Sequence, residues 1–120
     1  MACFSVSVPI HCLLMKSAFF LGDSLACIRD FPAAARSEAG HQIRRVQTGR
    51  DPDDWKPLKT VGQGVREIRV REASGAFRVI YLATIGDAVV VLHAFQKKTA
   101  QTAQHDIELA ASRLKAWRAS

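Results

Sequence analysis

The clearest pattern in this sequence is an alternation of polar and apolar residues that begins at position 65. In "VREIRVRE", residues 65–72, one face of a strand carries Glu67, Arg69 and Arg71, while the other carries apolar side chains such as Ile68. The turn "ASG" and a second strand, "AFRVIYLAT", complete a hairpin. A third strand, "AVVVLHAF", is apolar throughout, which predicts a central strand covered on both faces.

Upstream of the hairpin, the pattern predicts one short strand and two helices. The strand is "SAFFL", and the first helix begins with Asp23 or Ser24 as its cap and runs to about Asp30. Pro32 suits the first turn of the second helix, and Gly49 is placed to end it. The segment that follows, "DPDDWKPLKTVGQG", is rich in Pro, Asp and Gly and is expected to be a loop.

Helical spacing returns near the C-terminus. Ile107, Ala110 and Leu114 fall on one stripe of a last helix, for which Thr99 or Thr102 is the expected cap. The predicted order is therefore strand, helix, helix, three strands and helix. This order indicates an α+β domain with a small, mostly antiparallel sheet flanked by helices.

Length and charge narrow the class of protein. The 120 residues suit one domain, and the 48% of hydrophobic residues are enough for a core. The net charge is +6 and the isoelectric point about 9.7, which favours polyanionic partners such as RNA. Three cysteines without metal-ligand spacing fit free thiols in a reducing cytoplasm.

The first 15 residues, "MACFSVSVPIHCLLM", are mildly apolar. They lack the basic start of a signal peptide and are too short and broken for a membrane span. "MKSAFFLGDSL" reads as a natural beginning, so we expect Met15 to be the true start. Residues 1–14 are then an upstream extension, and residues 15–120 form the single domain.

Basic residues gather along the predicted hairpin. Arg69 and Arg71 share a face, Arg78 lies in the neighbouring strand, and Lys97 and Lys98 follow the third strand. Side-by-side strands can bring all five onto one surface, where a phosphodiester would offset their repulsion.

Arg78 also has an alternative that needs no ligand. An ion pair with Glu67 or Asp87 would satisfy the guanidinium, and the other arginines would then lie in solvent.

Two further side chains have both a chemical and a structural interpretation. His93 is a candidate general acid or base, or a histidine of the core. Tyr81 is a candidate for stacking on a base, or a core residue. The acidic residues do not cluster as a magnesium site would require, so no metal or other cofactor is expected.

The segment "DWKPLKTVGQGVREIRVREASGAFRVIYLAT", followed by "VLHAFQKKT", resembles the RelE/ParE toxin superfamily, and within it the phage-derived, HigB-like toxins of type II toxin–antitoxin systems. The likeness covers about residues 16–117. It implies a small antiparallel sheet flanked by helices, and a ribosome-dependent endonuclease that cuts mRNA. It also implies a cognate antitoxin, expected to be a small helix-turn-helix protein, and a cytoplasmic location without a membrane partner.

The resemblance assigns roles to several of the basic residues. Arg78 in "FRVIY" matches a catalytic arginine, and Lys98 in "QKK" matches a basic catalytic position, with Lys97 beside it. Arg69 and Arg71 match positions that hold RNA. The family tyrosine of the C-terminal segment is missing from "TAQTAQHD", so His93 is a substitute candidate for proton transfer.

Three function classes stay open at this point. The first is an mRNA endonuclease toxin. The second is a non-enzymatic protein of the same fold, either a gyrase inhibitor of the ParE type or an RNA binder. The third is an interaction module matched only to an antitoxin.

Overall fold

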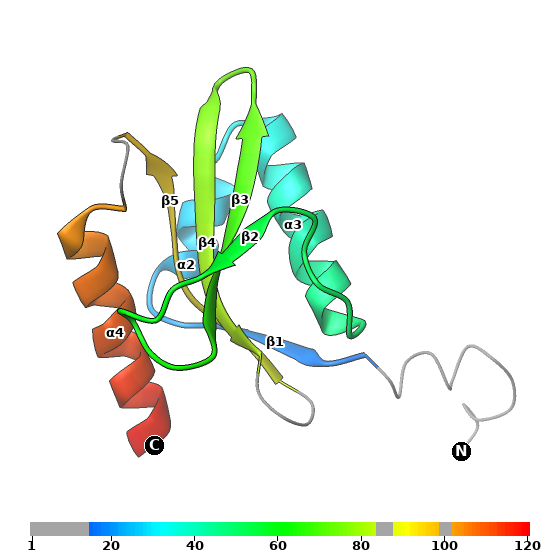
Figure 1. Ribbon diagram of the computed structural model, residues 1–120. Coiled ribbons are helices and arrows are strands. Elements are labelled where there is room, and N and C mark those ends of the chain that lie inside the picture. Colours follow the sequence, from blue (N-terminus) through cyan, green and yellow to red (C-terminus); the bar gives the residue numbers. More distant parts are fainter. Residues whose placement is uncertain (1–14, 84–87, 99–101) are drawn as a thin grey trace, which may run out of the picture.

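The computed structural model describes residues 15–83, 88–98 and 102–120 (Figure 1). Its elements, in chain order, are β1 (Ser17–Phe20), α2 (Ser24–Arg29), α3 (Ala33–Gln47), β2 (Trp55–Pro57), β3 (Val65–Glu72), β4 (Gly75–Ala83), β5 (Ala88–Lys97) and α4 (Gln104–Ala119). This order confirms the predicted succession of strands and helices, with β2 as an additional strand.

The strands form one sheet in the order β1-β5-β4-β3-β2. β1 runs parallel to β5, and the other neighbours are antiparallel, so the α+β prediction is confirmed. The all-apolar strand β5 lies inside the sheet between β1 and β4. α2 packs on one of its faces and α4 on the other, which explains why this strand has no polar face (Figure 1).

The added strand β2 lies in the segment that was expected to be a loop. Trp55–Pro57 pairs with β3 at the edge of the sheet, where proline is tolerated because its missing N–H faces no neighbour. The Arg66 guanidinium lies 3.9 Å from the centre of the Trp55 ring. The paired residues of β2 and β3 are 9 to 13 positions apart in the chain. The composition of the segment around β2 therefore does not reveal these contacts.

The two faces of the sheet carry two separate cores. Ile68 and Val79 pack under α2 and α3, whereas Ile80, Leu92 and Leu114 belong to the core under α4. The β3–β4 hairpin extends beyond the end of α4 (Figure 1). The outer part of the α4-side face is therefore left without a covering helix.

A β-bulge shapes the side of β5 that meets α4. The register shifts between Ile80, which pairs with His93, and Tyr81, which pairs with Val91. Leu92 is the extra residue, and it packs in the core under α4. The bulge thus turns two consecutive residues of β5, Leu92 and His93, toward the same helix.

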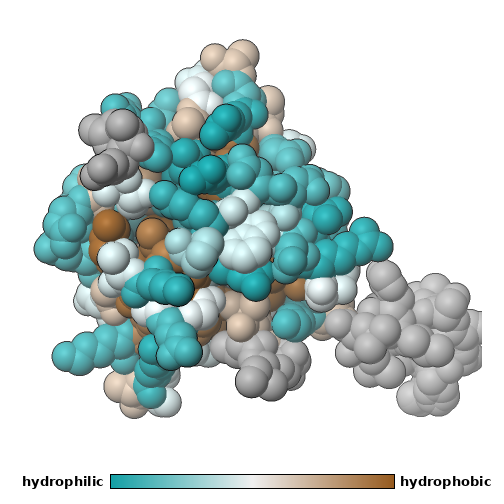
Figure 2. Space-filling model, viewed as in Figure 1, coloured by the Kyte–Doolittle hydropathy of each residue, from teal (hydrophilic) through white to brown (hydrophobic). Residues whose placement is uncertain are grey.

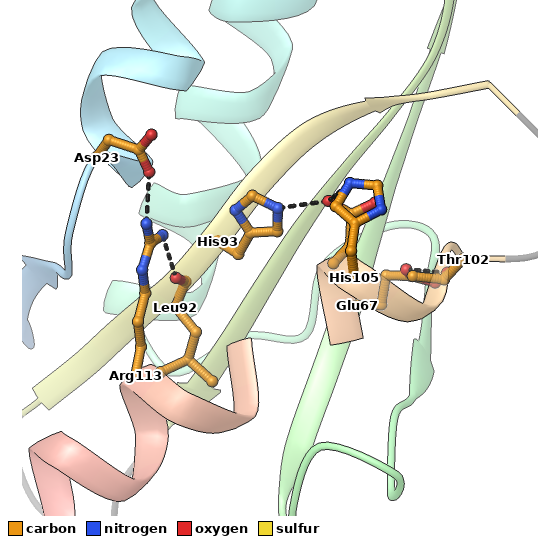
Figure 3. A network of polar contacts seen from close by, with 8 residues as sticks. Asp23, Glu67, Leu92, His93, Thr102, His105 and Arg113 are labelled. Carbon is orange, nitrogen blue, oxygen red and sulfur yellow. Dashed lines mark hydrogen bonds and ion pairs between the residues drawn. The ribbon is translucent and has the colours of Figure 1, made fainter. Parts of the chain in front are cut away.

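α4 is attached to the rest of the protein by polar contacts (Figure 3). Arg113 donates to the Asp23 carboxylate at 2.6 Å and to the Leu92 carbonyl at 3.0 Å. Thr102, just before the helix, donates to Glu67 at 2.7 Å.

The capping predictions hold in part. Asp23 is the N-cap residue of α2, as expected, although its side chain makes no capping bond, and the N-cap residue of α4 is Ala103. Both polar side chains that we expected near the caps, Asp23 and Thr102, bond distant residues instead. The other expected cap, Thr99, lies outside the described residues.

Some predictions fall outside the part of the chain that the structure describes. They are the upstream extension over residues 1–14 and Asp87 as a partner of Arg78. Among the helices that are described, none has the length and apolar character needed to span a membrane.

Two glycines provide a test of the contact between α4 and the β1–α2 turn. Gly22 has φ +54°, and a Cβ there would lie 2.5 Å from the Arg113 guanidinium. We expect Gly22→Ala to lower the free energy of unfolding by about 1–2 kcal/mol, because it strains the backbone and displaces Arg113. Urea unfolding measures the change.

Gly40→Ala is the matched control. Gly40 lies within α3, and a Cβ there would have no heavy atom within 4 Å. This substitution should raise the free energy of unfolding by about 0.5–1 kcal/mol. Equal effects of the two substitutions would contradict the proposed role of Gly22.

Candidate functional site

A group of basic side chains occupies the uncovered, outer part of the α4-side face. We call it the basic cluster; its members are Lys56, Arg69, Arg71, Arg78 and Lys97. They come from four neighbouring strands, β2 to β5. The cluster therefore exists only in the assembled sheet.

Strand register explains why these residues meet. Arg69 pairs directly with Arg78, and Arg78 in turn lies opposite Phe95 on β5. Lys97 lies opposite Ala76, two residues before Arg78 on the same face. Directly paired arginines repel each other, so the arrangement needs a compensating negative charge.

Glu67 supplies part of that charge from within the cluster. Its carboxylate is 0% exposed, and its Oε1 lies 3.8 Å from Arg78 Nε and 3.6 Å from Lys56 Nζ. Its Oε2 accepts the hydrogen bond from Thr102. Of the two partners considered for Arg78, Glu67 lies beside it, and Asp87 is outside the described residues.

The environment of Arg78 differs from the open sheet surface that we expected. The residue is only 4% exposed, and its Nη1 donates to the carbonyl of Phe77 at 3.1 Å. Its Nε has no hydrogen-bond partner among the described residues. The guanidinium is thus set into the face, with donor capacity that Glu67 does not use.

Burial and neighbouring charges change the pKa values of two residues of the cluster, Arg78 and Lys97. Burial lowers the pKa of Arg78, Glu67 raises it, and Arg69 and Arg71 lower it further. Burial also lowers the pKa of Lys97, and the nearby Arg78 adds to this effect. This effect agrees with the strand register, which places Arg78 and Lys97 on the same face of neighbouring strands.

The cluster keeps an excess of positive charge. Among the described residues, the other acidic side chain that acts on it is Asp54, 3.9 Å from Arg69. Five cations against two carboxylates leave three positive charges uncompensated. Hydrophilic residues cover this part of the face, over β2 and the β3–β4 hairpin, while hydrophobic residues show beside α4 (Figure 2). Such a surface suits a polyanion.

Lys97, the last residue of β5, and Lys98, which follows it, border a pocket of about 310 Å³ at the start of α4. Lys97, Lys98, His105 and Asp106 are among the residues that line it. Lys97 is half-buried and lies on the same face as Arg78, whereas Lys98 is exposed and follows the end of the strand. The structure thus brings Lys97 into the cluster and leaves Lys98 at the rim of the pocket.

His93 lies beneath α4. Its Nε2 is 2.7 Å from Asp106 Oδ1, its ring stacks on Phe95, and the residue is 6% exposed (Figure 3). In this position the imidazole faces a carboxylate of the helix instead of the basic cluster. The geometry agrees with the core interpretation of His93.

Tyr81 lies on the opposite face of the sheet from Arg78. It is 1% exposed and belongs to the core under α2 and α3, so it offers no ring surface to a nucleobase. The proposed stacking role is corrected for this reason. The alternation of β4 places residues 78 and 81 on different faces, which the strand pattern already contained.

Sequence reasoning missed two members of this site. Lys56 was overlooked because its segment was interpreted as a loop, although it pairs with Glu67 across β2 and β3. Glu67 was noted only as a possible partner of Arg78, and its complete burial has no signal in the sequence. In the described parts of the chain, no three His, Cys, Asp or Glu side chains gather as metal ligands would.

Residues 26–115 match the family model described as phage-derived protein Gp49-like (DUF891). The chain belongs to this family. A search among curated proteins found no match.

Among solved structures, the Gp49-like chain is similar to a mutant of the Escherichia coli toxin RelE in the free state. The two share 14% sequence identity over 85% of this chain and 97% of the other, with a TM-score of 0.59. At that identity, the likeness concerns the fold, and it confirms that the fold is RelE-like.

The contact between His93 and Asp106 gives a stability prediction. Asp106→Ala would leave the buried His93 ring without its partner, so we expect the free energy of unfolding to fall by about 1–3 kcal/mol.

The matched control is His105→Ala. His105 also lies near Asp106, at 3.4 Å, but its side chain is 80% exposed. It should change the value by no more than about 0.5 kcal/mol. Similar losses in both variants would refute a structural role that belongs to His93.

Proposed function

We propose that this protein is the toxin of a type II toxin–antitoxin system, of the HigB-like kind, and that it cleaves mRNA on the ribosome. The observation that carries the proposal is the basic cluster, because it places Arg78 and Lys97 on one face and its five cations exceed the two nearby carboxylates by three charges. The Gp49-like family and the RelE-like fold support the same class.

The chemistry suited to this site is transfer of an RNA phosphate onto its own ribose. The 2′-oxygen bonds to phosphorus, the bond from phosphorus to the 5′-oxygen breaks, and the proton lost by the 2′-hydroxyl is balanced by one gained at the 5′-oxygen. A 2′,3′-cyclic phosphate and a 5′-hydroxyl result. Arg78 and Lys97 would stabilise the negative charge that develops on the phosphate oxygens.

The remaining cluster residues suit the flanking backbone of the RNA. Arg71 is exposed, and Arg69 and Lys56 are half-buried, so each presents charge at the rim of the site. Such contacts hold RNA without reading its sequence. An antitoxin of this protein would present an acidic segment to the same surface, because that segment would occupy the cluster and exclude RNA.

Expression in bacteria tests the activity. We expect the wild type to arrest growth and to create new mRNA 5′ ends. Arg78→Ala should reduce cleavage by about 10²–10³-fold, because a charge on the reacting phosphate loses its partner. Arg78→Lys preserves the pair with Glu67 but loses the planar, bidentate guanidinium, so it should remain impaired.

Arg44→Ala is the control for general loss of positive charge. Arg44 is exposed on α3, which packs on the other face of the sheet, so this variant should remain fully toxic. Growth arrest without new 5′ ends would favour the non-enzymatic alternative of the ParE type. Relief of arrest by the product of the adjacent reading frame would identify the antitoxin, and full toxicity of Arg78→Ala at equal protein level would exclude the assignment.

The structure also separates the two lysines that the resemblance places together. Because Lys97 lies on the same sheet face as Arg78 and Lys98 is exposed beyond the end of β5, Lys97→Ala should slow cleavage more than Lys98→Ala, by about tenfold or more. Single-turnover cleavage by the two purified variants gives the comparison. A greater loss in Lys98→Ala would return the catalytic role to that residue.

A further inference from the structure

Glu67 is a carboxylate with no exposure to solvent, in a face otherwise built to attract anions. Burying a carboxylate is costly unless cations and hydrogen bonds surround it. A side chain of this kind also weakens the attraction of the cluster for RNA. Its position therefore calls for a role other than RNA binding.

The contacts of Glu67 divide its two oxygens between two tasks. Oε2 accepts the hydrogen bond from Thr102, which fixes the carboxylate from the side of α4 (Figure 3). Oε1 lies within ion-pair distance of Arg78 and Lys56, at 3.8 and 3.6 Å. Within the described residues, neither Oε1 nor Arg78 Nε has a hydrogen-bond partner.

This geometry attracts Arg78 without consuming its donors. The guanidinium is held by charge on one side and by the Phe77 carbonyl at Nη1. Charge at 3.8 Å in a buried site orients a guanidinium strongly, because solvent screens it little. The remaining N–H groups of Arg78 stay available for a phosphate.

We propose that Glu67 is a positioning residue, which orients Arg78 toward the scissile phosphate and is itself held in place by Thr102. The proposal rests on the proposed function for its phosphate. Because the side chain is fully buried and one oxygen is engaged by Thr102, Glu67 acts through Arg78 and does not contact RNA.

A positioning role predicts opposite effects on binding and on cleavage. Glu67→Gln removes one negative charge from the cluster, so RNA should bind more tightly. Arg78 loses the charge that orients it, so cleavage at saturating substrate should slow. A residue needed only for folding would weaken both properties, and a general base would remove the acidic limb of the pH profile of the cleavage rate.

The experiment compares Glu67→Gln with Asp54→Asn. Asp54 is half-exposed, its ion pair is with Arg69, and its charge is the weakest of those that act on Arg78, so the control removes the same charge from the same cluster. Binding is measured with a 12-nucleotide RNA carrying 2′-O-methyl groups, which cannot be cleaved. Cleavage is measured as the single-turnover rate on mRNA-programmed ribosomes at saturating concentration.

We expect both variants to bind the RNA about two- to fivefold more tightly, since each adds one unit of positive charge. Only Glu67→Gln should slow cleavage, by tenfold or more, with the acidic limb of its pH profile retained. Equal cleavage rates in the two variants, or loss of that limb in Glu67→Gln, would overturn the proposal.

Two further measurements keep the test decisive. Thr102→Ala releases the carboxylate without removing its charge, so it should slow cleavage with unchanged RNA affinity even if Glu67→Gln fails to fold.

NMR of the Arg78 Nε–Hε group reports the orientation of the guanidinium independently of cleavage activity. A rigid signal in the wild type that becomes mobile in either variant supports positioning, even if the wild type cleaves no RNA and the proposed function fails. Equal mobility in all the proteins would refute positioning.

Discussion

The charge balance around the buried carboxylate of Glu67 is the constraint on which the functional face depends. Hydrogen bonding in the sheet places Arg69 directly beside Arg78, with Lys56 and Lys97 on the flanking strands. Without a negative charge among them, pairing these strands would bring like charges together at positions where solvent screens them little. The pairs that Glu67 makes with Arg78 and Lys56 offset part of this repulsion and leave the remaining charge for a ligand.

The segment that leads into α4 is hydrogen-bonded to the same carboxylate. The N-terminal side of α4 is tied to the sheet through Thr102 and Glu67, and through Asp106 and His93. Its later turns are tied through Arg113 to Asp23 and to the Leu92 carbonyl. A helix with few buried side chains of its own is thus held by polar contacts at the boundary of the basic cluster. The ion pair of Arg78 and the docking of α4 therefore share the Glu67 side chain.

The two faces of the sheet also have different roles: one carries the core under α2 and α3, and the other carries the basic cluster. The core under α2 and α3 is made of apolar side chains from every second position of the central strands. On the other face, apolar residues continue only as far as α4 extends, and charged residues take over toward the hairpin tip. Substitutions in the cluster thus alter a surface whose supporting core lies on the far side, as is common for sites carried on rigid sheets.

The sequence by itself determined the elements except β2, and much of the charge pattern. Alternation along β3 placed Glu67, Arg69 and Arg71 on one face, and the all-apolar β5 indicated a strand with both faces covered; both hold in the structure. Tertiary structure alone decided the rest. The pairing of Lys56 with Glu67, the bulge at Leu92 and the burial of Glu67 and Arg78 depend on contacts between residues far apart in the chain. Periodicity reports which face a side chain is on, but burial and charge pairing depend on which strand or helix lies against that face.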